Sequence, residues 1–431
     1  MTESGRGDGR ARPLQLAPFR ALRYSPEFVS DLAAVTCPPY DVIGENGVAV
    51  WEAADPHNVV RLILPRSGTR EDRYTHAARD LRSWLDNGVL RSDEIPALYV
   101  YEHASGDAVA LGLVGAVSLH DPAEHVVLPH EDVFPGPVDD RAALMAATGA
   151  QLEPILLTYG GGGAASVTVD NALATDPVIE AATADGATHR IWRLTDRRIV
   201  EEIQADLAGR QALIADGHHR YAAYRALRDR IATGAVTGMS DAGQHGLAML
   251  VDADRHPLRL GSIHRSIAGL SLPEAVTAAA SVFQTVSLVP DLEPARALAA
   301  AGRNGHAFIV SDGRQSALLE HPISERVDAS LPPGRSPTWR RLDASIACEF
   351  MLPQLFRVDD SDSRVAYHHD AAEAVSRARR LGGIALLIRP ASHTDVLAIA
   401  AKGERMPRKS TSFGPKPRTG LLMRMLRGPR L

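Results

Sequence analysis

The sequence predicts a mixed α/β protein built from two domains. Short apolar runs of strand length alternate with segments whose apolar residues recur at helical spacing, from about residue 14 to about residue 403. The 431 residues exceed what a single hydrophobic core usually organises, which favours two domains. The 45% of hydrophobic residues is typical of an ordinary globular chain.

In the first half of the chain, the expected elements follow one another closely. We expect a strand over 14–24 with Pro18 at its edge, a loop stiffened by prolines over 37–43, a strand beginning at 58, a helix within 73–90 that stops at Gly88, hairpin strands over 96–104 and 109–119, a helix leading into a strand over 140–159, a glycine loop over 160–163, a strand over 189–196, a helix over 198–209 and a buried strand over 245–254.

The pattern starts again at about residue 271. Helices are expected over 273–283, 342–356, 371–382 and 394–403, and strands over 283–289, 307–312, 315–321, 365–370 and 383–390. The polar, Gly/Arg-rich residues 1–13 contain no apolar signal core, so we interpret them as a disordered leader. We therefore predict a first domain over 14–270 and a second α/β domain over 271–431.

Composition and charge exclude several classes of partner. The net charge of −5 provides no basic excess of the kind that a duplex-binding protein needs, which argues against a nucleic-acid partner. No apolar run approaches the ~20 residues that span a bilayer, so we expect no membrane partner. Two cysteines form neither a disulfide framework nor a metal cluster, and they fit the reducing cytoplasm. Composition gives no indication of the oligomeric state.

The stretch ALIADGHHRYAAYRALRDR, residues 212–230, predicts a buried strand, an Asp-Gly turn and then a helix. A helix N-terminus carries partial positive charge and unpaired N–H groups, so it is a ready anion site. We expect Asp216, Gly217, His218, His219 and Arg220 to bind phosphate there. Arg220 would contact the phosphate in bidentate fashion and the histidines would donate or transfer protons, while Asp216 would cap the helix or ligate a metal. A purely structural role, with Asp216 as the helix cap, stays open.

Acid–base chemistry has three further candidates. Asp41 follows the proline-stiffened loop and could act as a base or hold Mg²⁺, although a local turn would explain it equally well. His130 and Glu131 are neighbours between a strand and a proline-rich loop, which suits proton transfer or metal ligation.

Phosphate binding has further candidates along the chain. Arg61 stands at the start of a predicted strand, and an ion pair is its alternative role. His264 and Arg265 adjoin at a strand end and could form a second anion contact. The loop over 406–420 combines hydrogen-bond donors with glycines and prolines, although it lacks the Walker A pattern. We expect this loop to contact a ligand, and a basic tail is the alternative. Its candidate donors are Lys409, Ser410, Thr411 and Lys416.

These motifs resemble known families. CPPYDVI (37–43), NVVRLILP (58–65), LPHEDVF (128–134), ADGHHRYAA (215–223) and GERMPRKSTSFGPKPRTGLLM (403–423) are together similar to domain-of-unknown-function family 1015, whose name carries no activity. The segment DGHHRYAAYRAL resembles the helix start of the ParB/sulfiredoxin superfamily, whose members bind nucleotide phosphates there. That resemblance implies a ParB/sulfiredoxin-like core in the first domain. A cysteine of that helix start is replaced here by His218, which argues against a sulfinic-acid reductase.

The resemblance also suggests what the protein does. We expect a kinase-like phosphotransferase that uses a nucleotide (ATP, ADP or CTP) and Mg²⁺ to phosphorylate a small molecule, with free serine as one candidate. Glu131 or Asp41 would be the base, and Arg61, Arg265, Lys409 and Lys416 would stabilise charge in the transition state. Two alternatives remain: a nucleotide-binding switch without metabolic turnover, and a metal-dependent hydrolase that uses His130 and Glu131.

Overall fold

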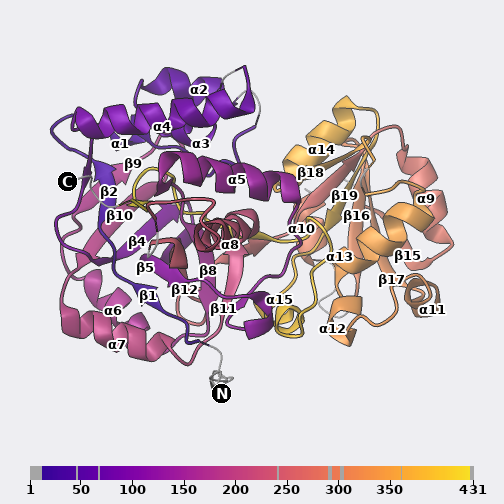
Figure 1. Cartoon of the computed structure of the whole chain (residues 1–431). Helices are drawn as coiled ribbons and strands as arrows, with labels where there is room; N and C mark the ends of the chain where they lie inside the picture. Colours follow the sequence, from indigo (N-terminus) through magenta and orange to yellow (C-terminus); the bar gives the residue numbers. More distant parts are fainter. Residues whose placement is uncertain are drawn as a thin grey trace. The chain divides into compact units, whose positions relative to one another are not determined.

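The computed structural model describes residues 12–44, 47–66, 68–239, 242–289, 294–300, 305–360 and 362–427. Most of the expected leader, residues 1–11, therefore lies outside the described residues. The chain divides into two compact units: unit 1 comprises 1–129, 133–259 and 414–431, and unit 2 comprises 130–132 and 260–413. The fold is mixed α/β, as expected (Figure 1).

Unit 1 is centred on a nine-stranded mixed sheet with the strand order β6-β11-β8-β12-β5-β4-β10-β9, in which β1 also pairs with β5. Its strands are β1 (Leu16–Ala17), β4 (Leu98–Ser105), β5 (Ala108–Ser118), β6 (Val127–Leu128), β8 (Ile155–Tyr159), β9 (Ile179–Ala182), β10 (Thr188–Leu194), β11 (Ala212–Asp216) and β12 (His245–Asp252). The central strands are buried almost throughout, because helices cover the sheet and water reaches neither face there.

The helices of unit 1 bury their apolar faces against this sheet and against each other. Helix α5 packs against both α4 and α8, and α6 packs against α7 (Figure 1). The helices are α1 (Leu32–Val35), α2 (Gly47–Ala54), α3 (Val60–Ile63), α4 (Arg70–Asp86), α5 (Pro135–Thr148), α6 (Ala164–Ala172), α7 (Arg197–Leu207) and α8 (His218–Ala232), with short 3-10 turns η1 (Pro122–Glu124) and η2 (Ala242–Gln244).

A second, four-stranded sheet completes unit 1. Its order is β3-β2-β21-β7, and its strands are β2 (Ala21–Tyr24), β3 (Leu90–Ser92), β7 (Ala150–Gln151) and β21 (Met423–Met425). Strand β21 comes from the C-terminal segment, which we had expected in the second domain. The segment is apolar and buries Leu421, Leu422, Met423 and Leu426, so pairing with β2 and β7 removes these side chains from water.

Unit 2 contains a six-stranded antiparallel sheet with the order β15-β17-β16-β19-β14-β18. Its strands are β14 (His264–Ile267), β15 (Phe283–Val289), β16 (Ala307–Ser311), β17 (Ser316–Pro322), β18 (Val365–His368) and β19 (Ile384–Ile388). Its helices are α9 (Leu272–Ala280), α10 (Pro294–Ala300), α11 (Ser324–Asp328), α12 (Pro337–Arg340), α13 (Asp343–Ile346), the π-helical segment η3 (Ala347–Leu355), α14 (Ala371–Arg380) and α15 (His393–Ala401). Alanines of α14 pack on β19, where small side chains allow a close approach.

The strands β13 (Arg259–Gly261) and β20 (Ser412–Gly414) lie where the chain passes from one unit to the other. The division after Arg259 precedes the expected boundary at 270 by about ten residues. The hairpin of β4 and β5 and the helix α4 are confirmed, whereas the strand expected from residue 58 is wrong, because Val60–Ile63 form helix α3. No helix of the described residues has the length and apolarity required to cross a membrane.

Candidate active site

The candidate site lies where strand β11 ends and helix α8 begins, in unit 1. Strand β11 is buried along its whole length and ends at Asp216, and the helix starts two residues later at His218. Between them Gly217 adopts φ +92°, in the left-handed region that favours glycine. An added Cβ at Gly217 would also lie 2.8 Å from Cγ2 of Ile155. Glycine is therefore required for both conformation and space at the helix N-cap, where it supplies no capping side chain.

Asp216 does not cap the helix, because its carboxylate is held by two cations. Oδ1 lies 2.5 Å from Nζ of Lys416, and Oδ2 accepts a hydrogen bond of 2.6 Å from Nη2 of Arg220. Burial opposes the charged form of Asp216, but Lys416 and Arg220 outweigh it and hold its pKa below the ordinary value. Burial likewise opposes the charged form of Lys416, but the carboxylates of Asp216 and Asp41 outweigh it and raise the pKa of Lys416 above the ordinary value. Both groups are therefore charged at neutral pH.

Arg220 is committed to protein acceptors. It is 3% exposed, and besides Asp216 its guanidinium donates a 2.8 Å hydrogen bond to the carbonyl oxygen of Pro154. The bidentate phosphate contact expected for Arg220 would require it to leave these partners. In this arrangement Arg220 positions Asp216, and Lys416 is the cation at the surface of the site, with 20% of its side chain exposed.

Asp41 brings a second carboxylate to the same cation. Its Oδ2 lies 3.6 Å from Nζ of Lys416 and 4.0 Å from Nη2 of Arg220, and 34% of its side chain is exposed. We call Asp41, Asp216, Arg220 and Lys416 the α8 cluster. Three segments that are far apart in the sequence, at 41, 216–220 and 416, thus place charged groups together at the start of α8.

Glu153 joins two of these segments and was missed in the sequence. Its Oε1 accepts a 2.9 Å hydrogen bond from the backbone N–H of Tyr40 and a 3.4 Å hydrogen bond from the hydroxyl of Thr419. Glu153 is buried, and burial raises its pKa above the ordinary value. A carboxylate two residues before the buried run 155–159 was the available signal, since a charged residue is buried only when it has partners.

Two histidines support the loop that carries Lys416: His189, which is buried, and His103, which is half-buried. The Nδ1 of His103 lies 2.8 Å from the carbonyl oxygen of Lys416, so this nitrogen carries the proton. The ring of His189 is tilted by 46° against that of His103, with centroids 4.4 Å apart, and its Nδ1 lies 2.9 Å from the hydroxyl of Tyr101. The same hydroxyl accepts a hydrogen bond from the backbone N–H of Arg418. These contacts fix the backbone on both sides of residue 417.

The two histidines that open α8 differ in exposure. His218 is buried, whereas His219 is half-buried and its Nε2 accepts a 3.1 Å hydrogen bond from the backbone N–H of Phe134. The acceptor role leaves the proton of a neutral His219 on Nδ1. The ring of Phe134 stacks on His219 with an interplanar angle of 16°, and 47% of Phe134 is exposed. An aromatic surface therefore adjoins the helix start.

Unit 2 contains the other acid–base candidates. Thr411 donates a 3.1 Å hydrogen bond to Oε1 of Glu131 and lies 3.0 Å from Nε2 of His130. Because a hydroxyl has one proton, Nε2 of His130 is the donor in the second contact. His130, Glu131 and Thr411 thus form a second group, which belongs to unit 2, whereas the α8 cluster belongs to unit 1. Among the described residues, no set of three His, Cys, Asp or Glu side chains is arranged to hold a metal ion.

Arg265 and its neighbours are structural in this arrangement. Arg265 is fully buried and donates to the carbonyl oxygens of Lys409 and Arg408, so it fixes the backbone of the 406–413 loop. The hydroxyl of Ser410 donates to the carbonyl oxygen of Pro407, 2.7 Å away. His264 accepts from the N–H of Ile388, and its pKa is lowered to about 4 by burial and by the charge of Arg265.

Arg61 lies on helix α3 and contacts α2. Its guanidinium donates a 2.8 Å hydrogen bond to the carbonyl oxygen of Glu52. The structure brings Asp41, Asp216, Gly217, Arg220 and Lys416 together, and it ties Arg61 to a neighbouring helix.

The family comparison agrees with the motifs. Residues 16–345 match the family described as "Protein of unknown function (DUF1015)". The chain belongs to this family. No curated protein matches the chain. This family description names no activity, so the match gives none. The expected ParB/sulfiredoxin-like core stays a prediction.

Several solved structures are distantly similar to this DUF1015 protein. A free serine kinase variant in complex with ADP is 14% identical with a TM-score of 0.33, and the match covers 67% of this chain and 84% of that chain. SbnI from Staphylococcus aureus, with a C-terminal truncation, is 13% identical with a TM-score of 0.36, covering 74% and 90%. A conserved hypothetical protein from Pyrococcus furiosus is 13% identical with a TM-score of 0.31, covering 67% and 87%. Scores of this size do not establish a shared function.

Proposed function

We propose that unit 1 binds the phosphates of a nucleotide at the start of α8 and transfers a phosphoryl group to a hydroxyl of a small molecule, with free serine as the first substrate to assay. One observation carries the proposal: Lys416, Asp41 and Asp216 converge from distant segments at a helix N-terminus whose cap is a glycine. Asp41 and Lys416 both retain solvent contact, so a ligand can reach them.

The helix start would bind the phosphates through charge and through backbone N–H groups. The partial positive charge at the N-terminus of α8 favours an anion. Lys416 would turn from Asp216 toward a phosphate oxygen, where a point charge with three donors suits the ligand. His218 and His219 occupy the first turn and could donate to the same phosphates. Arg220 would stay on Asp216, which keeps that carboxylate charged.

The chemistry assigns one role to each exposed group. Asp41 would accept the proton of the substrate hydroxyl as its oxygen bonds to the γ-phosphorus. The bond from that phosphorus to the β-phosphate oxygen breaks, and the nucleoside diphosphate leaves with the electron pair. Lys416 would stabilise the charge that develops on the transferred group.

Magnesium fits this arrangement only with the nucleotide present. Asp41 and Asp216 provide two carboxylates, and Mg²⁺ is usually bound by one or two carboxylates with substrate phosphates and waters as its other ligands. When bound, Mg²⁺ would neutralise phosphate charge and orient the phosphates. Asp216 is the residue that would hold it, because Asp41 acts as the base.

The test begins with thermal unfolding of the full chain in the presence of ATP, ADP, CTP, GTP or pyrophosphate, each with and without Mg²⁺. A ligand at about 100 times its Kd adds about 2.7 kcal/mol of stability, which such a scan detects. We expect a nucleotide to stabilise the protein, and a phosphoryl-transfer assay with that nucleotide and serine then tests turnover. If none of the ligands shifts the transition, the proposal is wrong.

Two variants separate binding from chemistry. Lys416→Gln should weaken nucleotide binding by about tenfold or more, because a charge-assisted contact is lost. Asp41→Asn should bind nucleotide but lose most of the transfer rate, since the amide cannot accept the proton. Lys402→Gln, at an exposed lysine of unit 2, is the matched control and should change neither quantity. Nucleotide binding without any transfer, in the wild type, would instead favour a nucleotide-binding switch.

A further inference from the structure

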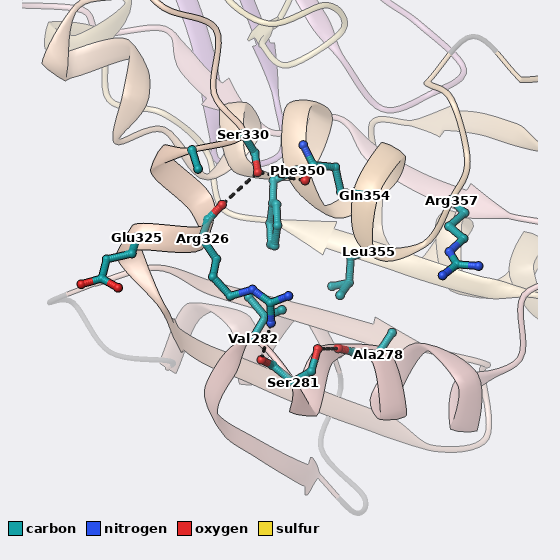
Figure 2. Close-up of a pocket in the computed structure, with 11 residues that line it drawn as sticks. Ala278, Ser281, Val282, Glu325, Arg326, Ser330, Phe350, Gln354, Leu355 and Arg357 are labelled. Carbon is teal, nitrogen blue, oxygen red and sulfur yellow. Dashed lines mark hydrogen bonds between the residues drawn. The ribbon is translucent and has the colours of Figure 1, made fainter.

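Among the cavities that lie outside the α8 cluster, two differ in how their polar groups are used. The cavity in unit 2 has a volume of about 610 Å³ (Figure 2). Three of its polar side chains bond to their own neighbours: Arg326 donates to the carbonyl oxygen of Ser281, and the hydroxyl of Ser330 donates to the amide oxygen of Gln354. The cavity in unit 1 is larger, at about 850 Å³, and its cations are arranged differently.

We call the second cavity the α4 cavity. Helix α4, the end of α5, the strand β21 and the segments before β2 and around β3 enclose it. Its volume lies within the range of known small-molecule sites. Its lining residues, none of which belongs to the α8 cluster, are Pro18, Phe19, Arg20, Ala78, Leu81, Arg82, Leu85, Asp86, Ser92, Pro96, Ala147, Thr148, Arg424, Met425, Leu426 and Arg427.

The floor of the α4 cavity is apolar and buried. Phe19 is 6% exposed, and Leu81 and Leu426 are each 2% exposed. Leu85 and Met425 add further apolar surface at half-buried positions. An apolar body placed here would displace water from surface that prefers contact with carbon, which is favourable in proportion to the area covered.

The lining is strongly cationic, with four arginines and one carboxylate, Asp86. Arg20 and Arg82 are exposed at the rim, and neither forms an ion pair with any residue that the structure describes. Arg427 donates to the carbonyl oxygen of Ala146 at the end of α5, whereas its buried Nε–H has no acceptor within the described ranges. A buried donor without an acceptor is destabilising, and an acceptor supplied by a ligand would remove this cost.

Burial also makes the positive charge at this site costly. Arg424 is 8% exposed and donates to the amide oxygen of Gln151 and to the carbonyl oxygen of His245. Burial lowers the pKa of Arg424 to about 10. An anion near Arg424 and Arg427 would compensate charge that the apolar floor leaves poorly solvated.

We propose that the α4 cavity binds a small organic anion, with a carboxylate or phosphate group at the arginines and an apolar body on the floor formed by Phe19, Leu81 and Leu426. This function is independent of the phosphotransferase site, because the cavity shares no residue with the α8 cluster. The two candidate head groups present the same chemistry to a guanidinium, namely oxygens that accept two parallel hydrogen bonds.

The test uses three probes with one ring system: 1-naphthyl phosphate, 1-naphthoate and neutral 1-naphthol. Isothermal titration with the full chain should show that at least one of the anions binds about tenfold or more tightly than 1-naphthol. The tighter anion identifies the head group. Binding of neither anion, or equal binding of 1-naphthol, overturns the proposal.

Variants locate the bound probe. The double variant Arg20→Gln and Arg82→Gln changes only exposed residues, so it should fold normally. Its affinity for the anion should be lower by about tenfold or more. Ala78→Phe fills part of the cavity and should remove binding. Arg79→Gln is the control, since Arg79 lies on the same helix, points to solvent beside Asp80 and does not line the cavity. Lys416→Gln should leave the affinity unchanged. Binding that is lost in Lys416→Gln but kept in the double arginine variant overturns the assignment.

Discussion

At the scale of single residues, a buried carboxylate stays ionised because cations reach it from two directions. Arg220 approaches Asp216 from the next turn of the same helix start, and Lys416 approaches from a segment 200 positions later. Removing one partner of such a group leaves a buried charge poorly compensated, which is costly. The same feature allows one cation to be exchanged for a ligand while the other stays in place.

Gly217 gives a prediction at this scale. Gly217→Ala should destabilise the protein by about 1–3 kcal/mol, because the backbone is left-handed there and the new Cβ would meet Ile155. Urea unfolding measures the loss. Gly234→Ala is the matched control, because φ is +75° at Gly234 and the added Cβ has open space. The control isolates the conformational cost, so equal losses in both variants would contradict a role for the Ile155 contact.

The residues of the site were predictable by type but not by partner. The stretch 212–230 indicated a strand, a turn and a helix start, and the structure has β11 and α8 in those places. The sequence could not show that Arg220 faces inward, since this depends on the carbonyl oxygen of Pro154, 66 positions away. It also could not show that Glu153 joins the Tyr40 and Thr419 segments, because each contact spans more than a hundred positions.

At the scale of elements, long periodic segments were predicted well and short apolar runs were not. Helix α4 and the β4–β5 hairpin follow the expected residues closely. A strand was expected to begin at residue 58, because short apolar runs such as 59–60 and 62–64 fit either class. Asn58 decides the outcome: its side-chain oxygen accepts the N–H of Val60 and its amide donates to the carbonyl oxygen of Ala34, which begins a helical turn.

Strand β21 provides a prediction for an element. Met423 is fully buried in the core that it shares with residues of β2 and β3. Met423→Ala should destabilise unit 1 by about 2–5 kcal/mol through lost burial and the cavity left behind. Chemical denaturation followed by tryptophan fluorescence measures it. Leu381→Ala, at a residue that is 40% exposed, should change stability by less than about 0.5 kcal/mol. A similar loss in both variants would contradict the structural role of β21.

At the scale of the whole molecule, two buried histidines make stability depend on pH. Burial is the main cause that lowers the pKa of His189 in unit 1 to about 3 and of His264 in unit 2 to about 4. The unfolded histidines titrate near pH 6.5, so the unfolded state binds more protons between these values. The stability that these two neutral histidines contribute is therefore fully present above about pH 6.5, and it is lost as the pH decreases toward 4.

Urea unfolding at pH 7.5 and pH 5.0 measures this dependence. Between its pKa in the folded protein and its pKa in the unfolded chain, each histidine lowers the free energy of unfolding by up to about 1.4 kcal/mol for each pH unit of acidification. His264→Asn keeps a side-chain acceptor for the Ile388 N–H and should make the dependence smaller. His76→Asn, at a half-buried position on α4, should leave the dependence unchanged. An identical pH dependence in wild type and His264→Asn would rule out this origin.

The path of the chain has a consequence for biosynthesis. Unit 1 includes residues 414–427, which a ribosome polymerises only after all of unit 2 from residue 260 to residue 413. At ordinary elongation rates this interval is on the order of ten seconds. During that interval the nascent unit 1 lacks both strand β21 and Lys416, so its sheet edge is open and Asp216 has one cation instead of two. Chaperones should therefore bind the nascent chain while residues 260–413 are being synthesised. A ribosome-bound nascent chain that ends at residue 413 should show no nucleotide binding.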